Sequence, residues 1–114
     1  MLEAALQSLQ ARAPFTPDLA IVLGSGLGEL ARRPEAQAGV AIPFSALGFP
    51  PQSVEGHSGQ LIFCELEGRR VVLQAGRFHF YEGHPLPVVT LPMRLYGRLG
   101  VKAVLLTNAA GALN

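Results

Sequence analysis

The feature that most constrains this chain is an unbroken apolar run that ends at a cluster of glycines. Residues 19–23 read LAIVL, and Gly24, Gly26 and Gly28 follow within GSGLG. Successive apolar positions leave no face for solvent, so the run predicts a strand buried on both faces. The glycines predict a tight loop, after which residues 27–33 are expected to begin a helix.

Strands and helices are expected to alternate along the rest of the chain. Further strands are predicted at 40–44, 60–66, 69–75 and 101–106, and helices at 3–12 and within 86–99. Glu67-Gly68 is expected to turn a hairpin, and the run at 101–106 to be another buried strand. We expect Pro92 to kink or delay the second helix and Gly100 to end it. These elements predict an α/β fold with a mixed β-sheet flanked by helices.

Length and composition place this fold in one domain over residues 1–114. Hydrophobic residues make up 49% of the chain and charged residues 15%, which is too apolar for a disordered protein. The net charge of +1 gives no general attraction to nucleic acid or to an anionic membrane. An anionic ligand must therefore be bound by individually placed groups.

The single cysteine and the pattern of the first residues both favour the cytoplasm as the cellular compartment. Cys64 is the only cysteine, so no internal disulfide can form, which favours a reducing environment. The first residues alternate apolar and polar side chains with a helical period, unlike a signal peptide. No apolar run approaches the roughly 20 residues that span a membrane. We expect a soluble cytoplasmic protein.

The glycine loop GSGLG has the features of a phosphate-binding loop. Glycines let backbone N–H groups approach an anion, and the hydroxyl of Ser25 could donate to a phosphate oxygen. However, Glu29 occupies the position of the third glycine in a dinucleotide fingerprint, and no Gly-Lys-Ser/Thr follows. A plain strand–turn–helix connection is about equally consistent with this segment alone.

The segment GRFHFYEGH at 76–84 gathers several groups that suit phosphate chemistry. In an extended conformation Arg77, His79 and Tyr81 share one face. Arginine offers a permanently charged bidentate fork to phosphate, and a nearby histidine can add a donor. A solvated loop in which Arg77 pairs with Glu82 remains an equally open alternative.

Two other loops carry weaker signals. His57 lies in the glycine-flanked turn GHSG, where a histidine is more often simply exposed. A zinc site formed by His57, His79 and His84 is disfavoured, because these residues lack the short-spaced ligand pairs of zinc sites. The segment TNAAG at 107–111 follows a predicted strand, and ligands of α/β proteins usually bind at such ends.

Together these four loops resemble the trimeric-type purine nucleoside phosphorylases. The matching segments occur in the family's order and are VLGSGLG at 22–28, EGHSG at 55–59, GRFHFYEGH at 76–84 and TNAAGALN at 107–114. The GRFHFYEG stretch is the most specific of them. Ala112 departs from the family, which commonly has a second glycine there.

The resemblance implies a role for each matching residue. The residues that match the family's phosphate ligands are Ser25, His57, Arg77, His79 and, through its backbone N–H, Ala109. Of these, His79 is also expected to be catalytic. Tyr81 matches the tyrosine beside the ribose, and Asn108 matches the loop that edges the nucleoside pocket.

The implied activity is phosphorolysis of the N-glycosidic bond of purine (deoxy)ribonucleosides to the free base and (deoxy)ribose 1-phosphate, as in purine salvage. The family is homotrimeric and needs no metal or organic cofactor, and no nucleic acid or membrane partner is expected. Methylthioadenosine phosphorylases share the fold and the Arg-His pair, but the FHFYEG context favours the purine nucleoside branch.

The resemblance covers the phosphate-binding half of the family's domain. The glutamate and asparagine with which the family binds the purine lie in a later segment than residues 1–114, so this chain alone is expected to be inactive. The alternatives are a non-catalytic phosphate- or nucleotide-binding fragment and a truncated gene product. The choice between 6-oxo and 6-amino purines stays open.

Overall fold

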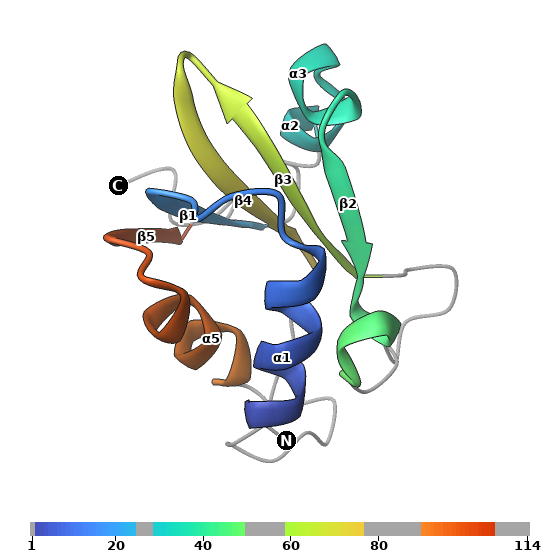
Figure 1. Ribbon diagram of the computed structural model, residues 1–114. Coiled ribbons are helices and arrows are strands. Elements are labelled where there is room, and N and C mark those ends of the chain that lie inside the picture. Colours follow the sequence, from blue (N-terminus) through green and yellow to red (C-terminus); the bar gives the residue numbers. More distant parts are fainter. Residues whose placement is uncertain (1, 25–28, 50–58, 77–89, 107–114) are drawn as a thin grey trace.

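A computed structural model describes residues 2–24, 29–49, 59–76 and 90–106 of the chain. They form a five-stranded mixed sheet with the order β2-β3-β4-β1-β5, and helices lie on both sides of it (Figure 1). The predicted α/β class with a mixed, helix-flanked sheet is confirmed. Among the described helices the longest has 11 residues, and none could cross a membrane.

The parallel part of the sheet consists of β1 (Leu19–Leu23), β4 (Arg69–Ala75) and β5 (Ala103–Leu106). β1 lies between the other two and is parallel to both. The last four residues of β1 are buried, as an apolar run without alternation requires. The predicted bounds of β1 and β4 are confirmed.

The antiparallel part consists of β2 (Val40–Pro43) and β3 (Gln60–Leu66), with β3 also pairing with β4. Glu67 and Gly68 connect β3 to β4, and both have positive φ angles, 52° and 80°. Two-residue loops with positive φ at both positions match the right-handed twist of the flanking strands. The predicted hairpin is confirmed.

One face of the sheet is covered by α1 (Leu2–Arg12) and α5 (Leu91–Leu99), which lie side by side in Figure 1. The guanidinium of Arg98 contacts both carboxylate oxygens of Glu3, at 2.6 and 3.3 Å, and so connects the two helices. Between these two helices and the sheet, buried residues of both form a core cluster. They include Ala5, Leu6, Leu9, Ala20, Leu61, Phe63, Val72, Leu91, Leu95 and Tyr96.

Both predicted helices on this face are confirmed, and the structure decides how Pro92 is accommodated. Pro92 lies in the first turn of α5, where its missing N–H has no intrahelical partner to lose. It therefore delays the helix and does not kink it. Gly100 has a φ of 94° and ends the helix in the left-handed conformation, as expected.

The other face is covered by two short helices, α2 (Glu29–Arg32) and α3 (Pro34–Gln37). Ala36 of α3 is buried in a second core cluster, which also contains Ile21, Leu23, Ile62, Cys64, Leu66, Val71 and Leu73. The predicted helix at 27–33 is present from Glu29, and residues 27 and 28 lie outside the described ranges. We did not predict α3, which begins with proline at a position that suits this residue.

The predicted strand at 40–44 is one residue too long. Phe44 begins a 3-10 helix, η1 (Phe44–Leu47), within a segment that was expected to be a loop. Phe44 and Leu47 are buried in the core beside α1, so packing gives this segment a helical turn. Gly48 ends the turn with a φ of 76°.

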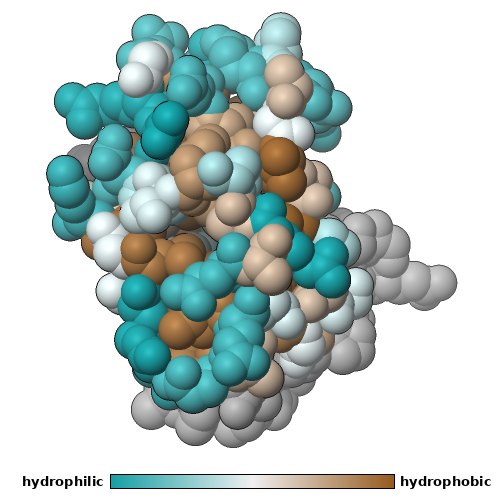
Figure 2. All heavy atoms as spheres, in the orientation of Figure 1, coloured by the Kyte–Doolittle hydropathy of each residue, from teal (hydrophilic) through white to brown (hydrophobic). Residues whose placement is uncertain are grey.

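The prediction of a buried strand at 101–106 is wrong in two respects. The strand begins at Ala103, and all four of its residues are exposed. The reason is its position, because β5 is the last strand in the sheet order of the described residues and has β1 as its one neighbour there. Figure 2 shows apolar side chains left uncovered between polar ones on the face viewed in Figure 1.

Candidate functional site

One edge of the sheet collects the ends of four strands. β1 ends at Leu23, beside Ala75, the last residue of β4. Val22 pairs with Leu106, where β5 ends. β3 runs antiparallel to β4 and starts at Gln60, also opposite Ala75. The carboxyl ends of β1, β4 and β5 and the amino end of β3 therefore lie side by side, and we refer to them as the carboxyl edge.

Each of the four sequence motifs is attached to this carboxyl edge. The glycine loop follows β1, the GRFHFYEGH segment follows β4, the TNAAGALN segment follows β5, and EGHSG leads into β3. Ligands of open α/β sheets bind outside the carboxyl ends of the strands. The topology thus brings together the attachment points of segments that lie far apart in the sequence.

The predicted site residues themselves lie outside the described part of the chain. They are Ser25, His57, Arg77, His79, Tyr81, Asn108 and Ala109. Glu82 and His84, which the ion-pair and zinc alternatives require, lie outside it as well. Their roles and those alternatives therefore stay predictions. What the structure gives is the position of the strand ends: Ser25 and Arg77 each follow the last residue of their strand by two positions.

The described residues offer no metal site and no reactive thiol. Among them, no three His, Cys, Asp or Glu side chains are grouped so that they could hold a metal ion. Cys64 is buried in β3, and burial raises the pKa of its thiol. A nucleophilic cysteine needs the opposite shift.

Gly59, the last residue of the EGHSG motif, has a packing reason to be glycine. A Cβ atom at this position would lie 2.1 Å from the ring of Phe44, closer than any real contact. The carbonyl oxygen of Gly59 also accepts a hydrogen bond of 3.0 Å from the backbone N–H of Phe44. η1 therefore packs directly on the backbone that leads into β3, which fixes where the EGHSG segment joins the carboxyl edge.

A buried polar pair at the carboxyl edge was missed by the sequence reasoning. Gln74 of β4 is 2% exposed, and its side-chain oxygen accepts a hydrogen bond of 2.5 Å from the hydroxyl of Tyr96 in α5. Its side-chain nitrogen donates to the carbonyl oxygen of Gly76 at 2.9 Å. Burial raises the pKa of Tyr96, so the phenol stays protonated and can donate. The available signal was a glutamine inside the apolar run VVLQA, on the same face as Val72.

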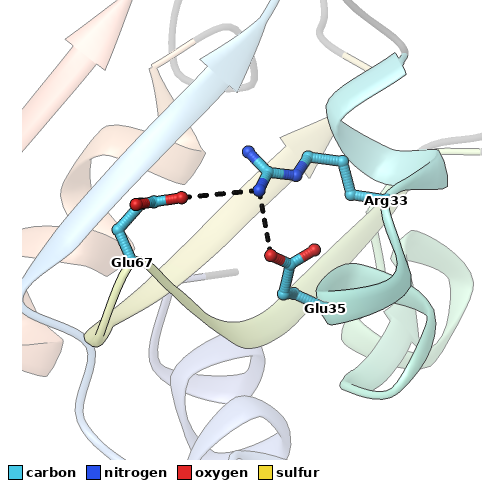
Figure 3. A network of polar contacts seen from close by, with 3 residues as sticks. All are labelled: Arg33, Glu35 and Glu67. Carbon is cyan, nitrogen blue, oxygen red and sulfur yellow. Dashed lines mark hydrogen bonds and ion pairs between the residues drawn. The ribbon is translucent and has the colours of Figure 1, made fainter.

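The charged network in Figure 3 lies at the opposite end of the β3–β4 hairpin. The guanidinium of Arg33 contacts Glu35 at 2.9 Å and Glu67, in the hairpin turn, at 3.5 Å. A hydrogen bond within Glu35 and then the contact with Arg33 lower the pKa of the Glu35 carboxyl. Arg33 and Glu35 are half-buried and Glu67 is exposed, and ion pairs this close to solvent contribute little to stability. The network joins the start of α3 to the hairpin and is not part of the carboxyl edge.

An open groove of ≈370 Å³ also lies away from the carboxyl edge. It is lined by residues of the α1–β1 connection, of the segment from α3 to the start of β2, and of β3. They are Pro14, Phe15, Glu35, Ala38, Gly39, Val40, Phe63, Cys64 and Glu65. None of the four motifs is attached to it. The candidate site is therefore the carboxyl edge and not this groove.

The comparisons with known proteins define the class. The sequence profile of the Phosphorylase superfamily matches residues 18–114, which include all five strands and all four motifs. The chain belongs to this superfamily.

Within the superfamily the chain is similar to the N-terminal portion of purine nucleoside phosphorylases. It is 46% identical over 114 residues to purine nucleoside phosphorylase 1 of Geobacillus stearothermophilus, and the match covers 99% of this chain and 41% of that protein. The purine nucleoside phosphorylase of Schistosoma mansoni solved with acetate superposes with a TM-score of 0.84 at 41% identity, covering 95% of this chain and 39% of that one. A Schistosoma mansoni purine nucleoside phosphorylase solved with inosine gives a TM-score of 0.83 at 39% identity, covering 95% of this chain and 37% of that one. The chain thus spans about two fifths of the length of these relatives.

Proposed function

We propose that these residues form the phosphate-binding part of a purine nucleoside phosphorylase. The observation that carries the proposal is the attachment of all four motifs to one carboxyl edge. Ligands of open α/β sheets bind outside the carboxyl ends of the strands, and four motifs with groups suited to phosphate are attached at that edge. A solvated loop or a plain turn would account for one such motif but not for all four. The relatives with solved structures are purine nucleoside phosphorylases, one of them in complex with inosine, which favours this activity over methylthioadenosine phosphorolysis.

The proposed roles follow the motifs. Phosphate is held by Ser25, His57, Arg77, His79 and the backbone N–H of Ala109. Arg77 supplies a bidentate, permanently charged contact, and His79 a second donor that keeps the reacting oxygen in place. Tyr81 and Asn108 contact the nucleoside. The proposed phosphate ligands belong to the segments that adjoin β1, β3, β4 and β5, so one small anion would be bound from four strand ends.

The chemistry is a displacement at C1′ of the sugar. A phosphate oxygen forms a bond to C1′ while the bond from C1′ to the purine nitrogen breaks, and its electron pair leaves with the base. The base takes up a proton, which balances the one that monohydrogen phosphate loses overall, and the products are free purine and (deoxy)ribose 1-phosphate. Bound phosphate supplies the nucleophile and places negative charge beside the ribosyl cation that develops in the transition state.

The proposal also covers the cofactor requirement, the cellular compartment and the oligomeric state. We propose that no metal or organic cofactor takes part, that the enzyme acts in the cytoplasm, and that the full-length protein is a homotrimer. Residues 1–114 then represent the phosphate-binding part of a single domain. The lone buried cysteine is consistent with a reducing compartment.

Arg77→Ala tests the phosphate site in the complete product of the gene that encodes these residues. Loss of a charge-assisted bidentate contact costs about 1.5–3 kcal/mol, so the KM for phosphate should rise about ten-fold or more. The KM for inosine should change far less. Both constants come from initial rates of inosine phosphorolysis with phosphate and inosine varied in turn.

The matched control is Arg69→Ala, which removes an exposed arginine from the other end of the same strand. It should leave both KM values unchanged. A phosphate KM that stays constant in Arg77→Ala, or that rises equally in Arg69→Ala, would remove Arg77 from the site.

For a polypeptide limited to residues 1–114 we propose phosphate binding without turnover. Two observations favour this second candidate: the match covers 41% of a relative's length, and β5 is left exposed. We expect inorganic phosphate to raise the Tm of this polypeptide and inosine phosphorolysis to stay at the background rate. Turnover at an ordinary enzymatic rate from a monomer would contradict this candidate.

A further inference from the structure

Gln74 is a polar side chain in an otherwise apolar part of the core. It lies on the face of β4 that α5 covers, two positions after Val72, and it is 2% exposed. A buried amide without partners is strongly unfavourable, so its hydrogen bonds decide whether the position is tolerable. Gln74 accepts from Tyr96 at 2.5 Å and donates to the Gly76 carbonyl at 2.9 Å.

These two hydrogen bonds fix the amide in one orientation. The phenol of Tyr96 donates, so the oxygen of the amide must face α5, which directs the nitrogen at the Gly76 carbonyl. Such a pair is not required for stability, because two apolar side chains of similar shape can be as stable. What an apolar pair lacks is a donor that holds a particular backbone carbonyl.

The carbonyl held in this way is the last described one before the GRFHFYEGH segment continues. Gly76 follows β4 directly and has a φ of 118°, a conformation that favours glycine. Its C=O belongs to the planar peptide group that joins it to the next residue, so fixing the carbonyl fixes the plane from which the chain proceeds. Through Gln74, a helix on one face of the sheet is thereby connected to the carbonyl at which the chain leaves the carboxyl edge.

We propose that Gln74 and Tyr96 are positioning residues for phosphate binding, acting through the Gly76 peptide group on the direction in which the chain enters the GRFHFYEGH segment. This inference rests on the function proposed above. Neither side chain is among the proposed phosphate or nucleoside ligands. They act by limiting the freedom of the backbone that carries the proposed phosphate ligands.

Gln74→Met and Tyr96→Phe test this role in the complete gene product. Methionine keeps the length of glutamine but removes both hydrogen bonds, whereas Phe removes one hydroxyl. We expect the KM for phosphate to rise about five-fold in Gln74→Met, which loses the hydrogen bond to the Gly76 carbonyl as well as that from Tyr96. It should rise about two-fold in Tyr96→Phe, which loses only the hydrogen bond that orients the amide. The KM for inosine should change less than the KM for phosphate in both. The double variant should be no worse than Gln74→Met, because both changes break one chain of contacts.

Val72→Ala is the control for a merely structural effect. It creates a cavity on the same strand and the same face, and it should lower the Tm without raising the KM for phosphate. If the phosphate KM instead follows the Tm across Val72→Ala, Gln74→Met and Tyr96→Phe, the pair only stabilises the core and the inference is wrong. Tyr96→Phe keeps the test valid if Gln74→Met does not fold.

The inference and the proposed function fail in different ways. An unchanged phosphate KM in Gln74→Met and Tyr96→Phe, beside a raised one in Arg77→Ala, refutes the positioning role alone. Absence of inosine phosphorolysis, together with no effect of inorganic phosphate on the Tm of the unmodified protein, refutes the proposed function and this inference with it.

Discussion

β4 and β5 lie on either side of β1 and run parallel to it, yet one is buried and the other exposed. In β4 the exposed fractions of Val72 and Leu73 are both 0%. In β5 those of Leu105 and Leu106 are 50% and 62%. Both strands are apolar at these positions, so residue type does not distinguish them. Burial depends on the neighbours, since β4 has a strand on each side and a core cluster on each face.

The two edge strands of the sheet, β2 and β5, differ in how well they resist pairing with another chain. β2, at the far edge, ends in Pro43, which has no N–H to offer to another strand. β5 reads Ala-Val-Leu-Leu and contains neither proline nor charge. An exposed apolar edge strand invites pairing with other chains. We therefore expect additional protein to pair with the sheet at β5 and not at β2.

The largest expected effect is a difference in stability between Leu73→Ala in β4 and Leu105→Ala in β5. In the polypeptide of residues 1–114, Leu73→Ala should lower the free energy of unfolding by about 3 kcal/mol, because it leaves a cavity in a packed core. Leu105→Ala should lower it by about 0.5 kcal/mol or less, as substitutions at exposed positions do. Urea titrations at low protein concentration measure both.

Equal losses in the two variants would break the comparison, because they would mean that β5 is already covered in this polypeptide. The same two variants can also be compared in a longer chain. If an added segment packs on β5, the cost of Leu105→Ala should rise toward that of Leu73→Ala, while the cost of Leu73→Ala itself stays the same.

The parts of the fold that the sequence predicted are those set by local patterns. β1 follows from five successive apolar residues, and the β3–β4 hairpin from two β-rich runs on either side of Glu67-Gly68. α1 follows from apolar residues at helical spacing. α3 and η1 were missed, because four-residue helices carry too little periodicity and depend on the packing of Ala36 and Phe44.

In the candidate site, too, local sequence predicted some features, whereas others depend on packing between distant residues. The four motifs and their order could be read from the sequence, and the strand order that gathers them at one edge agrees with where ligands bind in α/β sheets. The contact between Gln74 and Tyr96 could not be read, because it joins residues 22 positions apart through the packing of α5 on β4. The burial of β5 was predicted wrongly for a related reason, since an apolar sequence does not say whether a neighbour is present.

Leu105→Lys combined with Leu106→Lys tests whether the exposed strand drives association. Neighbouring side chains of a strand point to opposite faces, so the two lysines place charge on both faces of β5. The polypeptide of residues 1–114 should elute from a sizing column as larger species when its concentration rises, and the double variant should elute as a monomer throughout. Charged residues on an edge strand act in this way in natural sheets.

The control must separate the position of the charge from its amount. Gln7→Lys with Gln10→Lys adds the same two positive charges to exposed positions of α1, away from β5. Because net charge alone can keep proteins apart, a monomer in both double variants would show that repulsion and not the edge strand controls association. Association that persists in Gln7→Lys/Gln10→Lys and disappears in Leu105→Lys/Leu106→Lys locates it at β5. The free energy of unfolding should barely change in either double variant, since all four positions are exposed. A difference in association between the two variants therefore reports on the outer edge of β5, where the described residues supply no neighbouring strand.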